Sequence, residues 1–508
     1  MRSTSICANT GARYKAAPRI CDYARRVDWH GLALAYRGEG YPTAALGAAR
    51  RAAGENPEHL AAQITFGRLC EEAGYAGEAI GAFEAARRLA PHDAGIAREL
   101  ASAYRRGARA TDALAAAEAA LRLDPGNAAS YLCLGEALLA NEAALPADRM
   151  FCKALALDSR LALAECGRGA VHLLAARWHE ARAAFERALL IDPNGAEARY
   201  NLALIDLRFE AYAAGFAGYR AIMDTAEQRP RYHYYHSGVP VWDGTPLGTR
   251  RLAIAYEQGL GNQMQMARFF DALPAFGGSV AIETPPPLLG LLRRNFPALT
   301  FVSFSNWQPL EAMDVHLPLM QLPAVLNVAR ESDLAMREPY LHAHPARVAA
   351  LREQLPLEDG LRRVGISWHG NRANARDRWR AAALPEWAAL AHVPGVRFYS
   401  LQFETTPDEL AQSPFPLVPA HELISDLDDT AALACLMDLV ISVDTSTVHL
   451  AGALGRPVWM PQPLLSDYRW GVDRTDSPWY PHLRLFRQRT RDDWRPVFEQ
   501  MAAALAAG

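Results

Sequence analysis

The residues best suited to chemistry lie between Asp438 and Trp459, in the segment DLVISVDTSTVHLAGALGRPVW. Its pattern predicts a buried strand over Leu439–Val443, a polar loop, a helix over Val448–Leu454 and then a second strand. Hydroxyls and backbone N–H groups at the start of a helix face the positive end of its dipole, which suits a phosphate. The alternative is a capped helix without a ligand. The residues of the expected phosphate loop are Asp444, Thr445, Ser446 and Thr447.

A second polar segment, Ser367–Arg372, follows a predicted strand over Arg363–Trp368 and leads to the arginine-rich run Asp377–Arg380. Carboxyl ends of parallel strands share one sheet edge, so this segment is expected near the phosphate loop. Arginine forks can neutralise the charge of a diphosphate leaving group, and Arg378 and Arg380 are the better candidates. The alternative is a solvated basic loop.

A third segment, Gly259-Leu260-Gly261-Asn262, lies between a predicted strand over Arg251–Tyr256 and a predicted helix over Gln263–Leu273. Gly259 and Gly261 would let a ligand approach the backbone, although a plain tight turn also explains them. Gln402 follows a strand over Phe398–Leu401, at a place suited to contact a nucleobase or ribose.

These segments, with Asp467–Trp470, Asp476–Pro481 and Arg484–Gln488 downstream, resemble the C-terminal half of bacterial glycosyltransferases linked to tetratricopeptide (TPR) repeats. Those enzymes are similar to the heptosyltransferase family, of GT-B fold, and more loosely to the O-linked N-acetylglucosamine transferases. The resemblance covers about Val241–Phe498. It implies two Rossmann-like lobes with a cleft between them and a nucleotide-diphosphate sugar as donor. It also implies a ligand role for His449, although a lone histidine on a helix is more often structural.

The chain matches the family's basic motif in part and departs from it at the expected catalytic base. Arg372 replaces a proline and Ala381 a serine, while five motif residues match. The family's base is an aspartate, and Asn262 stands in its place. An amide cannot accept a proton at neutral pH, so either Glu257 serves or the chain binds without turnover. The matching motif residues are Gly370, Asn371, Asp377, Arg378 and Arg380.

The N-terminal half carries an internal repeat. Pro57, Pro91, Pro125 and Pro193 keep one phase with a spacing of 34 residues or twice that, which is the TPR length. Small residues recur at fixed helical offsets and let paired helices approach closely. Since one repeat cannot bury its own apolar face, the array forms a helical solenoid. Its groove would hold a protein or peptide, or the array acts as a scaffold only.

Composition sets the remaining limits. At 508 residues the chain needs two or three domains, and its net charge of −3 predicts no general attraction to nucleic acid or membrane. Seven cysteines without metal-ligand spacing indicate buried thiols in a reducing compartment, and no apolar run reaches membrane-spanning length. The expectation is a cytoplasmic protein without a metal site or cofactor.

The sequence therefore predicts a TPR solenoid followed by an α/β module of GT-B type. The function expected first is metal-independent transfer of a sugar from a nucleotide-diphosphate donor to a protein or glycan chosen by the repeats. The alternative is a TPR adaptor with a degenerate, non-catalytic transferase domain, and a GT-B epimerase or phosphorylase ranks third. The expected segments are a disordered tail over 1–25, repeats over 26–228, a linker over 229–248, an acceptor lobe over 249–345 and a donor lobe over 360–500.

Overall fold

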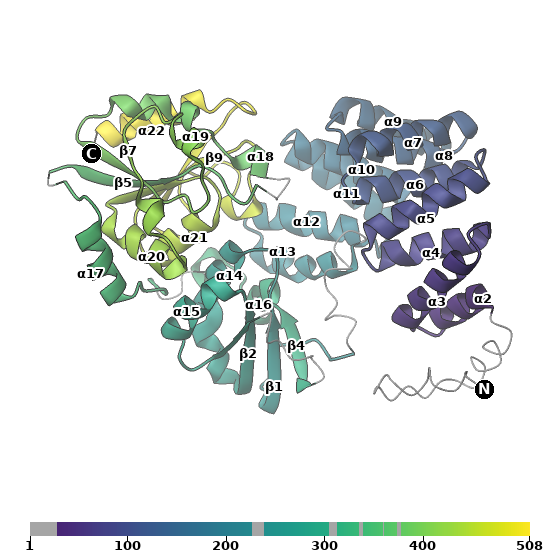
Figure 1. The fold of residues 1–508 in the computed structure, drawn as a ribbon, viewed down its shortest axis with the longest axis horizontal. Coiled ribbons are helices and arrows are strands. Elements are labelled where there is room, and N and C mark those ends of the chain that lie inside the picture. Colours follow the sequence, from purple (N-terminus) through teal and green to yellow (C-terminus); the bar gives the residue numbers. More distant parts are fainter. Residues whose placement is uncertain are drawn as a thin grey trace. The chain divides into compact units, whose positions relative to one another are not determined.

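The computed structural model describes residues 28–225, 238–303, 312–334, 339–358, 360–372 and 377–507. The expected N-terminal tail lies outside these residues. The chain divides into two compact units, and Figure 1 shows the elements of each. One unit comprises Met1–Gly195 with Thr225–Arg231, and the other comprises Ala196–Asp224 with Tyr232–Gly508.

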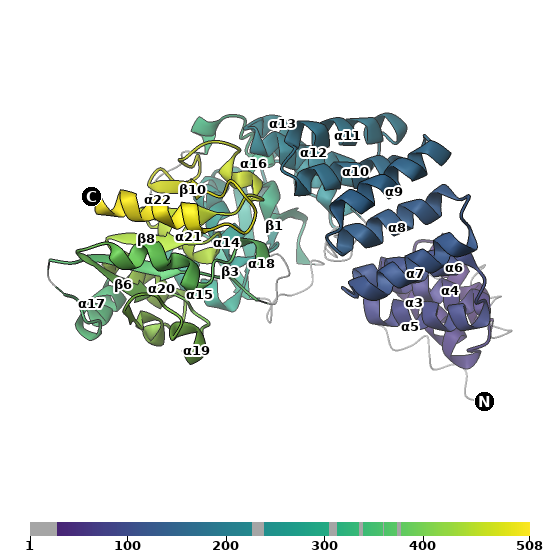
Figure 2. The ribbon, with the colours of Figure 1, turned by 90° about the horizontal axis from the view of Figure 1, so that it is seen from above.

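The first unit is a stack of antiparallel helix pairs, seen from above in Figure 2. The second helices of successive pairs end at Glu55, Leu89, Leu123, Leu157 and Ile191, each 34 residues after the last. This period confirms the TPR solenoid. The helices are α2 (Trp29–Gly38), α3 (Pro42–Glu55), α4 (Leu60–Glu72), α5 (Ala76–Leu89), α6 (Ala94–Arg106), α7 (Ala110–Leu123), α8 (Ala128–Ala140), α9 (Ala144–Leu157), α10 (Ala162–Leu174) and α11 (Trp178–Ile191).

In several of these pairs, a glycine of the first helix packs against a phenylalanine ring of the second helix. A methyl group at Gly135 would lie 2.5 Å from the ring of Phe151, and one at Gly169 would lie 2.6 Å from the ring of Phe185. Both rings are fully buried. The missing side chain of one helix therefore makes room for the ring of the next, which is why small residues recur in phase.

The second unit begins with a helical hairpin, α12 (Ala196–Arg208) and α13 (Tyr212–Tyr219), followed by the 3-10 helix η2 (Arg220–Asp224). The sequence phase assigns this hairpin to a sixth repeat at the end of the solenoid. The structure groups it with the α/β region instead. Its aromatic residues, Tyr212, Phe216 and Tyr219, belong to the same buried cluster as Leu252 of the first sheet.

The first sheet is parallel, with the strand order β3-β2-β1-β4. The sequence also predicts strands over Ser279–Glu283 and Thr300–Phe304, which with Arg251–Tyr256 match β2, β3 and β1, whereas the short β4 was not predicted. The expected helix after β1 is split into a seven-residue α-helix and a 3-10 helix that contains Pro274. The elements are β1 (Gly248–Ala255), α14 (Leu260–Met266), η5 (Ala267–Phe276), β2 (Gly277–Thr284), α15 (Pro286–Asn295), β3 (Thr300–Ser303) and β4 (Val315–Pro318).

The end of the expected linker packs on this sheet. The backbone N–H of Trp242 donates to the carbonyl of His316 at 2.7 Å, and the side chains of Trp242 and Leu247 are buried. Residues 239–248 therefore extend the α/β fold, while the preceding part of the expected linker lies outside the described residues.

The second sheet is also parallel, in the order β10-β9-β8-β5-β6-β7. Neighbouring residues of β8 alternate between two hydrophobic clusters, with Leu439 and Ile441 in one and Val440 in the other. Both faces are thus covered, as a parallel sheet requires. The strands are β5 (Arg362–Ser367), β6 (Val396–Ser400), β7 (Leu417–Val418), β8 (Leu439–Ser442), β9 (Val458–Gln462) and β10 (Leu483–Arg487).

Candidate functional site

The expected phosphate loop connects β8 to α21 (Ser446–Ala453). Thr445 is the N-cap residue of α21, and its Oγ1 accepts a hydrogen bond from the backbone N–H of Thr447 at 3.3 Å. The Oγ atoms of Ser442 and Thr445 lie 3.2 Å apart. The predicted strand, polar loop and helix are therefore present, and the cap fixes the start of the helix.

Asp444 points its carboxylate at the indole of Trp470, whose Nε1 donates to Oδ2 at 3.0 Å. Burial raises the pKa of Asp444, and the neighbouring carboxylate of Asp467 raises it further. The guanidinium of Arg380 opposes this rise, as does that of Arg469. The positive charge of Arg380 therefore acts on Asp444, in the loop near which this arginine is expected from the sequence.

Asp377 fixes the side chain of Arg380. Oδ1 of Asp377 accepts from the backbone N–H of Gly370 at 2.8 Å and from Nε of Arg380 at 3.0 Å. A methyl group at Gly370 would lie 2.6 Å from Nη2 of Arg380, so a side chain at this position would displace the guanidinium. Arg378, in the same short helix α18 (Asp377–Arg380), lies over the ring of Trp379 at 5.2 Å. The two candidate arginines thus have different surroundings.

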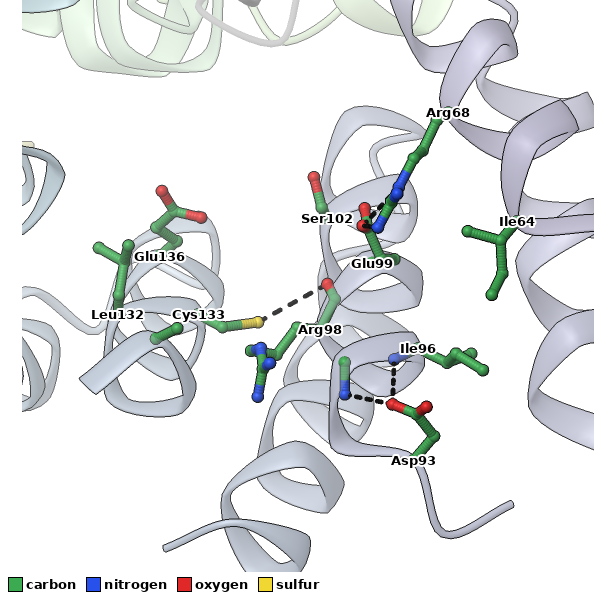
Figure 3. A pocket seen from close by; sticks show the side chains of 12 residues that line it. Ile64, Arg68, Asp93, Ile96, Arg98, Glu99, Ser102, Leu132, Cys133 and Glu136 are labelled. Atoms are coloured by element: carbon green, nitrogen blue, oxygen red, sulfur yellow. Dashed lines mark hydrogen bonds and ion pairs between the residues drawn. The ribbon is translucent and has the colours of Figure 1, made fainter. Parts of the chain in front are cut away.

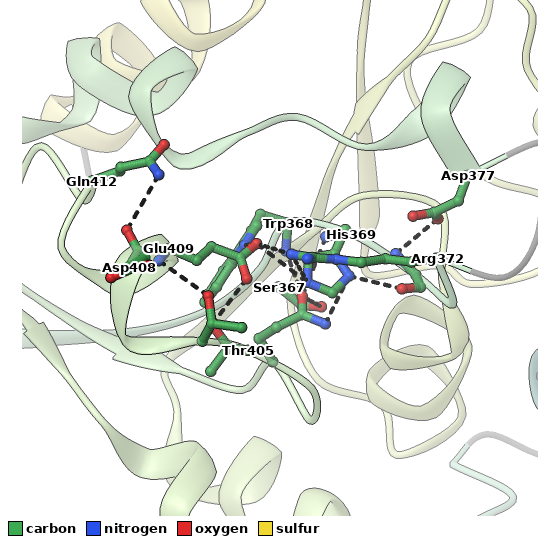
Figure 4. A network of polar contacts seen from close by, with 12 residues as sticks. Ser367, Trp368, His369, Arg372, Asp377, Thr405, Asp408, Glu409 and Gln412 are labelled. Carbon is green, nitrogen blue, oxygen red and sulfur yellow. Dashed lines mark hydrogen bonds and ion pairs between the residues drawn. The ribbon is translucent and has the colours of Figure 1, made fainter.

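Arg378 lines a pocket of about 410 Å³ beside the loop after β5. Figure 4 shows the polar network in this region, which centres on Glu409. Its carboxylate accepts from Nε1 of Trp368 at 2.7 Å and from Nη2 of Arg372 at 2.6 Å, and it lies 3.3 Å from Nε2 of His369. Burial raises the pKa of Glu409, but these three partners together lower it below its ordinary value. Glu409 was not among the residues predicted from the sequence.

Gln402 is buried and holds the loop after β5. Its Oε1 accepts from the backbone N–H groups of Trp368 at 3.0 Å and His369 at 3.2 Å, and from Oγ of Ser367 at 3.1 Å. Three donors therefore share this oxygen. Asn371, the other amide expected at the donor site, is exposed in the same loop.

His449 is buried in an aromatic cage. Its Nδ1 lies 2.9 Å from the hydroxyl of Tyr480, and its ring stacks on Trp470 with the centroids 5.6 Å apart. Burial, helped by the positive charge of Arg469, lowers the pKa of His449 from 6.5 to about 3. The ring is therefore neutral at pH 7 and contributes no positive charge to the phosphate loop.

Gly261 packs against this histidine. A methyl group at Gly261 would lie 2.6 Å from Cδ2 of His449, so α14 and α21 approach closely at this point. The sequence predicts that Gly261 lets a ligand approach the backbone. In the structure, the side chain of His449 makes this close approach. At Gly259, a methyl group would meet nothing within 4 Å.

Asn262 lies in the first turn of α14, with both ends of its amide engaged. Nδ2 donates to Oε1 of Gln258 at 2.8 Å, and Oδ1 accepts from Nη2 of Arg469 at 3.0 Å. Glu257, the other candidate base, is 4% exposed, and its Oε2 accepts from the backbone N–H of Met320 at 2.7 Å. Both residues therefore accept a hydrogen bond from within the protein.

Arg469 is the central cation of this cluster, and its role was not foreseen from the sequence. Besides Asn262 it donates to Oε1 of Gln265 and to Oδ1 of Asp467, the latter at 2.7 Å. Burial alone would raise the pKa of Asp467, but the contact with Arg469 lowers it, so this pair is ionised. In the sequence, Asp467–Trp470 stands out only through the resemblance, and no spacing links it to Asn262.

The solenoid carries a groove of its own, a pocket of about 450 Å³ lined by the first helices of three successive repeats. Arg68 pairs with Glu99 at 2.6 Å, and Asp93 caps the start of α6; Figure 3 shows both contacts. The Sγ of Cys133 donates to the carbonyl of Arg98 at 3.9 Å. The lining mixes both signs of charge with apolar side chains.

The described part of the chain has no cluster of three or more histidine, cysteine or acidic residues able to hold a metal ion. None of the helices that the structure describes is long and apolar enough to span a bilayer. Five of the seven cysteines are described, and none of these five forms a disulfide; Cys70 is buried and Cys152 exposed.

No family model matches the chain. Protein FlbA of Caulobacter vibrioides is 30% identical over 292 residues, which cover 52% of this chain and 48% of that protein. The chain thus spans about half the length of this curated relative. Among solved structures, a thermophilic TPR protein of Thermus thermophilus, TTC0263, is 23% identical, with a TM-score of 0.32, over 35% of this chain and 98% of that one. MamA from Desulfovibrio magneticus RS-1 is 17% identical, with a TM-score of 0.29, over 33% and 94%.

Proposed function

We propose that the second unit is a metal-independent glycosyltransferase of GT-B type, which moves a sugar from a nucleotide-diphosphate donor to an acceptor selected by the TPR array. The acceptor is a hydroxyl or amide group of a protein or glycan. The motif resemblance and the pair of parallel sheets support this proposal. A helix dipole and arginines can supply the positive charge that other transferases take from a metal.

One observation carries the proposal: the N-terminus of α21 and the guanidinium of Arg380 act on the same loop. Thr445 caps the helix, and Arg380 influences the ionisation of the adjacent Asp444. A helix N-terminus and a guanidinium are both groups suited to bind a diphosphate. Since His449 is neutral, we assign the charge complementarity to Arg380 and the helix and not to the histidine.

The test is a screen of the purified full chain for donor hydrolysis and transfer with UDP-, GDP-, ADP- and CMP-sugars. We expect one nucleotide class to be consumed, and consumption to be lost in Arg380→Ala. The absence of turnover with all four classes would overturn the proposal.

Asn262 favours a second candidate, a TPR adaptor whose transferase domain no longer turns over. Its amide is engaged by Gln258 and Arg469, and it supplies no proton acceptor where the resembling family has a carboxylate. Binding of a nucleotide sugar without hydrolysis or transfer in the same screen would favour this adaptor function.

A further inference from the structure

The helical hairpin α12–α13 contacts the two loops that build the candidate site. At its first helix, Arg208 donates from Nη1 to Oγ of Ser466 at 3.1 Å and to the carbonyl of Gly471 at 3.3 Å, and from Nη2 to the carbonyl of Ser466. Burial lowers the pKa of Arg208 to about 10, so the guanidinium stays charged at pH 7. One buried guanidinium thus holds the two ends of the loop 466–471 together.

This clamped loop carries the side chains that reach the site. Nε1 of Trp470 donates to Asp444, and Nη2 of Arg469 donates to Asn262. A change in the position of the loop would therefore move the indole against the expected phosphate loop and the guanidinium against α14.

The second helix of the hairpin fixes the other loop. The hydroxyl of Tyr219, at the end of α13, accepts a hydrogen bond from Nε2 of Gln258. Oε1 of Gln258 in turn accepts from Nδ2 of Asn262 at 2.8 Å. The glutamine thus links a tyrosine of the hairpin to the position of the family's base.

Gln258 adopts a backbone conformation that normally requires glycine. Its φ is +66°, and the next residue, Gly259, has the extended value of −159°. A non-glycine residue in the left-handed region costs about 1 kcal/mol or more and persists where its surroundings hold it. The two side-chain hydrogen bonds of Gln258 provide that hold, and one of them comes from the hairpin.

The hairpin is itself anchored firmly. The ring of Phe216 meets that of Trp479 edge-on at 6.4 Å, and Glu210 pairs with Arg474 at 2.6 Å. Arg474 also pairs with Glu331 at 3.1 Å. The hairpin can therefore serve as a rigid support and not as a loosely attached end of the repeats.

We propose that Tyr219 and Arg208 are positioning residues for sugar transfer: Tyr219 holds the loop 257–262 on the acceptor side, and Arg208 holds the loop 466–471 on the donor side. This inference rests on the proposed glycosyltransferase function. It makes the hairpin part of the catalytic unit, so the helices that look like a last repeat complete the site.

The test compares Tyr219→Phe with Tyr212→Phe in the full chain. Both tyrosines lie in α13 and are buried, but the hydroxyl of Tyr212 has no hydrogen-bond partner among the described residues. Tyr219→Phe should lower kcat by about tenfold or more, in keeping with the cost of small misplacements, and leave the donor KM unchanged. Arg208→Lys, which keeps the charge and loses the fork, should raise the donor KM. Tyr212→Phe should change neither constant.

Hydrogen–deuterium exchange of the same variants gives a readout that needs no turnover. Amides of residues 257–266 should exchange faster in Tyr219→Phe than in Tyr212→Phe, while the protection of the TPR helices stays the same. Equal exchange and equal kcat in the two variants would overturn the inference. It would also be overturned if both variants lost kcat and melting temperature to the same extent. If the wild type consumes none of the UDP-, GDP-, ADP- or CMP-sugars, the proposed function fails, and the exchange comparison alone decides whether Tyr219 positions the loop.

Discussion

Arg469 and Asn262 meet in a hydrogen bond of 3.0 Å between Nη2 and Oδ1, although 207 residues of chain separate them. The arginine follows β9 of the second sheet, and the asparagine opens the helix after β1 of the first sheet. Through this bond Asn262, where the chain departs from the motif of the resembling family, joins the polar cluster around Arg469. A carboxylate at this position would meet the guanidinium of Arg469 directly.

Asn262→Asp should raise the turnover of sugar transfer, or create it, while nucleotide affinity stays the same. A general base contributes typically about 10²–10⁴-fold, but the adjacent Arg469 lowers the pKa of the new carboxylate and weakens it as a base. We therefore expect a rise of only about 10- to 100-fold in kcat, measured by steady-state kinetics.

Asn262→Ala is the control, and it should give no rise in kcat. If Asn262→Asp is neutral or harmful and Glu257→Gln abolishes transfer, the base is Glu257 and the first prediction is wrong.

Gly261→Ala should destabilise the protein through a clash with a buried ring. The added methyl group would lie 2.6 Å from Cδ2 of His449, which Trp470 and Tyr480 hold from other sides. Overpacking of this kind costs about 1–3 kcal/mol of unfolding free energy, measurable as a lower urea midpoint. Gly259→Ser is the matched control, since its Cβ meets nothing within 4 Å and serine is a good N-cap. Equal midpoints for the two variants would contradict the close contact.

His449 should make the folded state less stable in acid. Its pKa is about 3 in the folded protein against 6.5 for a free histidine, so the unfolded chain binds a proton that the folded chain does not. The free energy of folding that the neutral ring contributes is fully present above pH 6.5. It falls as the pH drops toward 3, by at most about 1.4 kcal/mol per pH unit. The stability of His449→Gln should therefore depend less steeply on pH below 6.5 than that of the wild type.

Denaturant titrations at pH 7, 6 and 5 measure this difference. His482→Gln, at an exposed histidine, is the matched control for the substitution itself. Parallel curves for His449→Gln and the wild type would show that the ring is not held neutral by burial.

Local patterns predicted much of the fold. The 34-residue phase predicted the helix pairs of the first unit, and continuous apolar runs predicted strands such as β5 and β8, because burial on both faces leaves a clear signal. Strands β4, β7 and β10 were not predicted. The first two have only four and two residues, too few for a periodic pattern.

The hairpin α12–α13 shows where a sequence phase stops being informative. Gly215 and Tyr219 keep the repeat phase, and both helices are present. What the phase cannot tell is which surface the helices cover, since that depends on the partners of Phe216 and Tyr219 in the α/β core. The site shows the same limit: Arg469 and Gln265 meet only after the two sheets are assembled.

The central claim is that a donor diphosphate binds at the N-terminus of α21 beside Arg380, and calorimetric titration tests it most directly. The ligand is the nucleotide sugar that the donor screen selects, and the proteins are wild type, Thr445→Ala, Thr445→Ser and Arg380→Ala. Loss of one hydrogen bond to a charged group is worth about 1.5–3 kcal/mol, so each alanine variant should bind roughly ten- to hundredfold more weakly. Thr445→Ser keeps the hydroxyl and should retain its affinity. Unchanged affinity in both alanine variants would contradict the account and place the donor elsewhere.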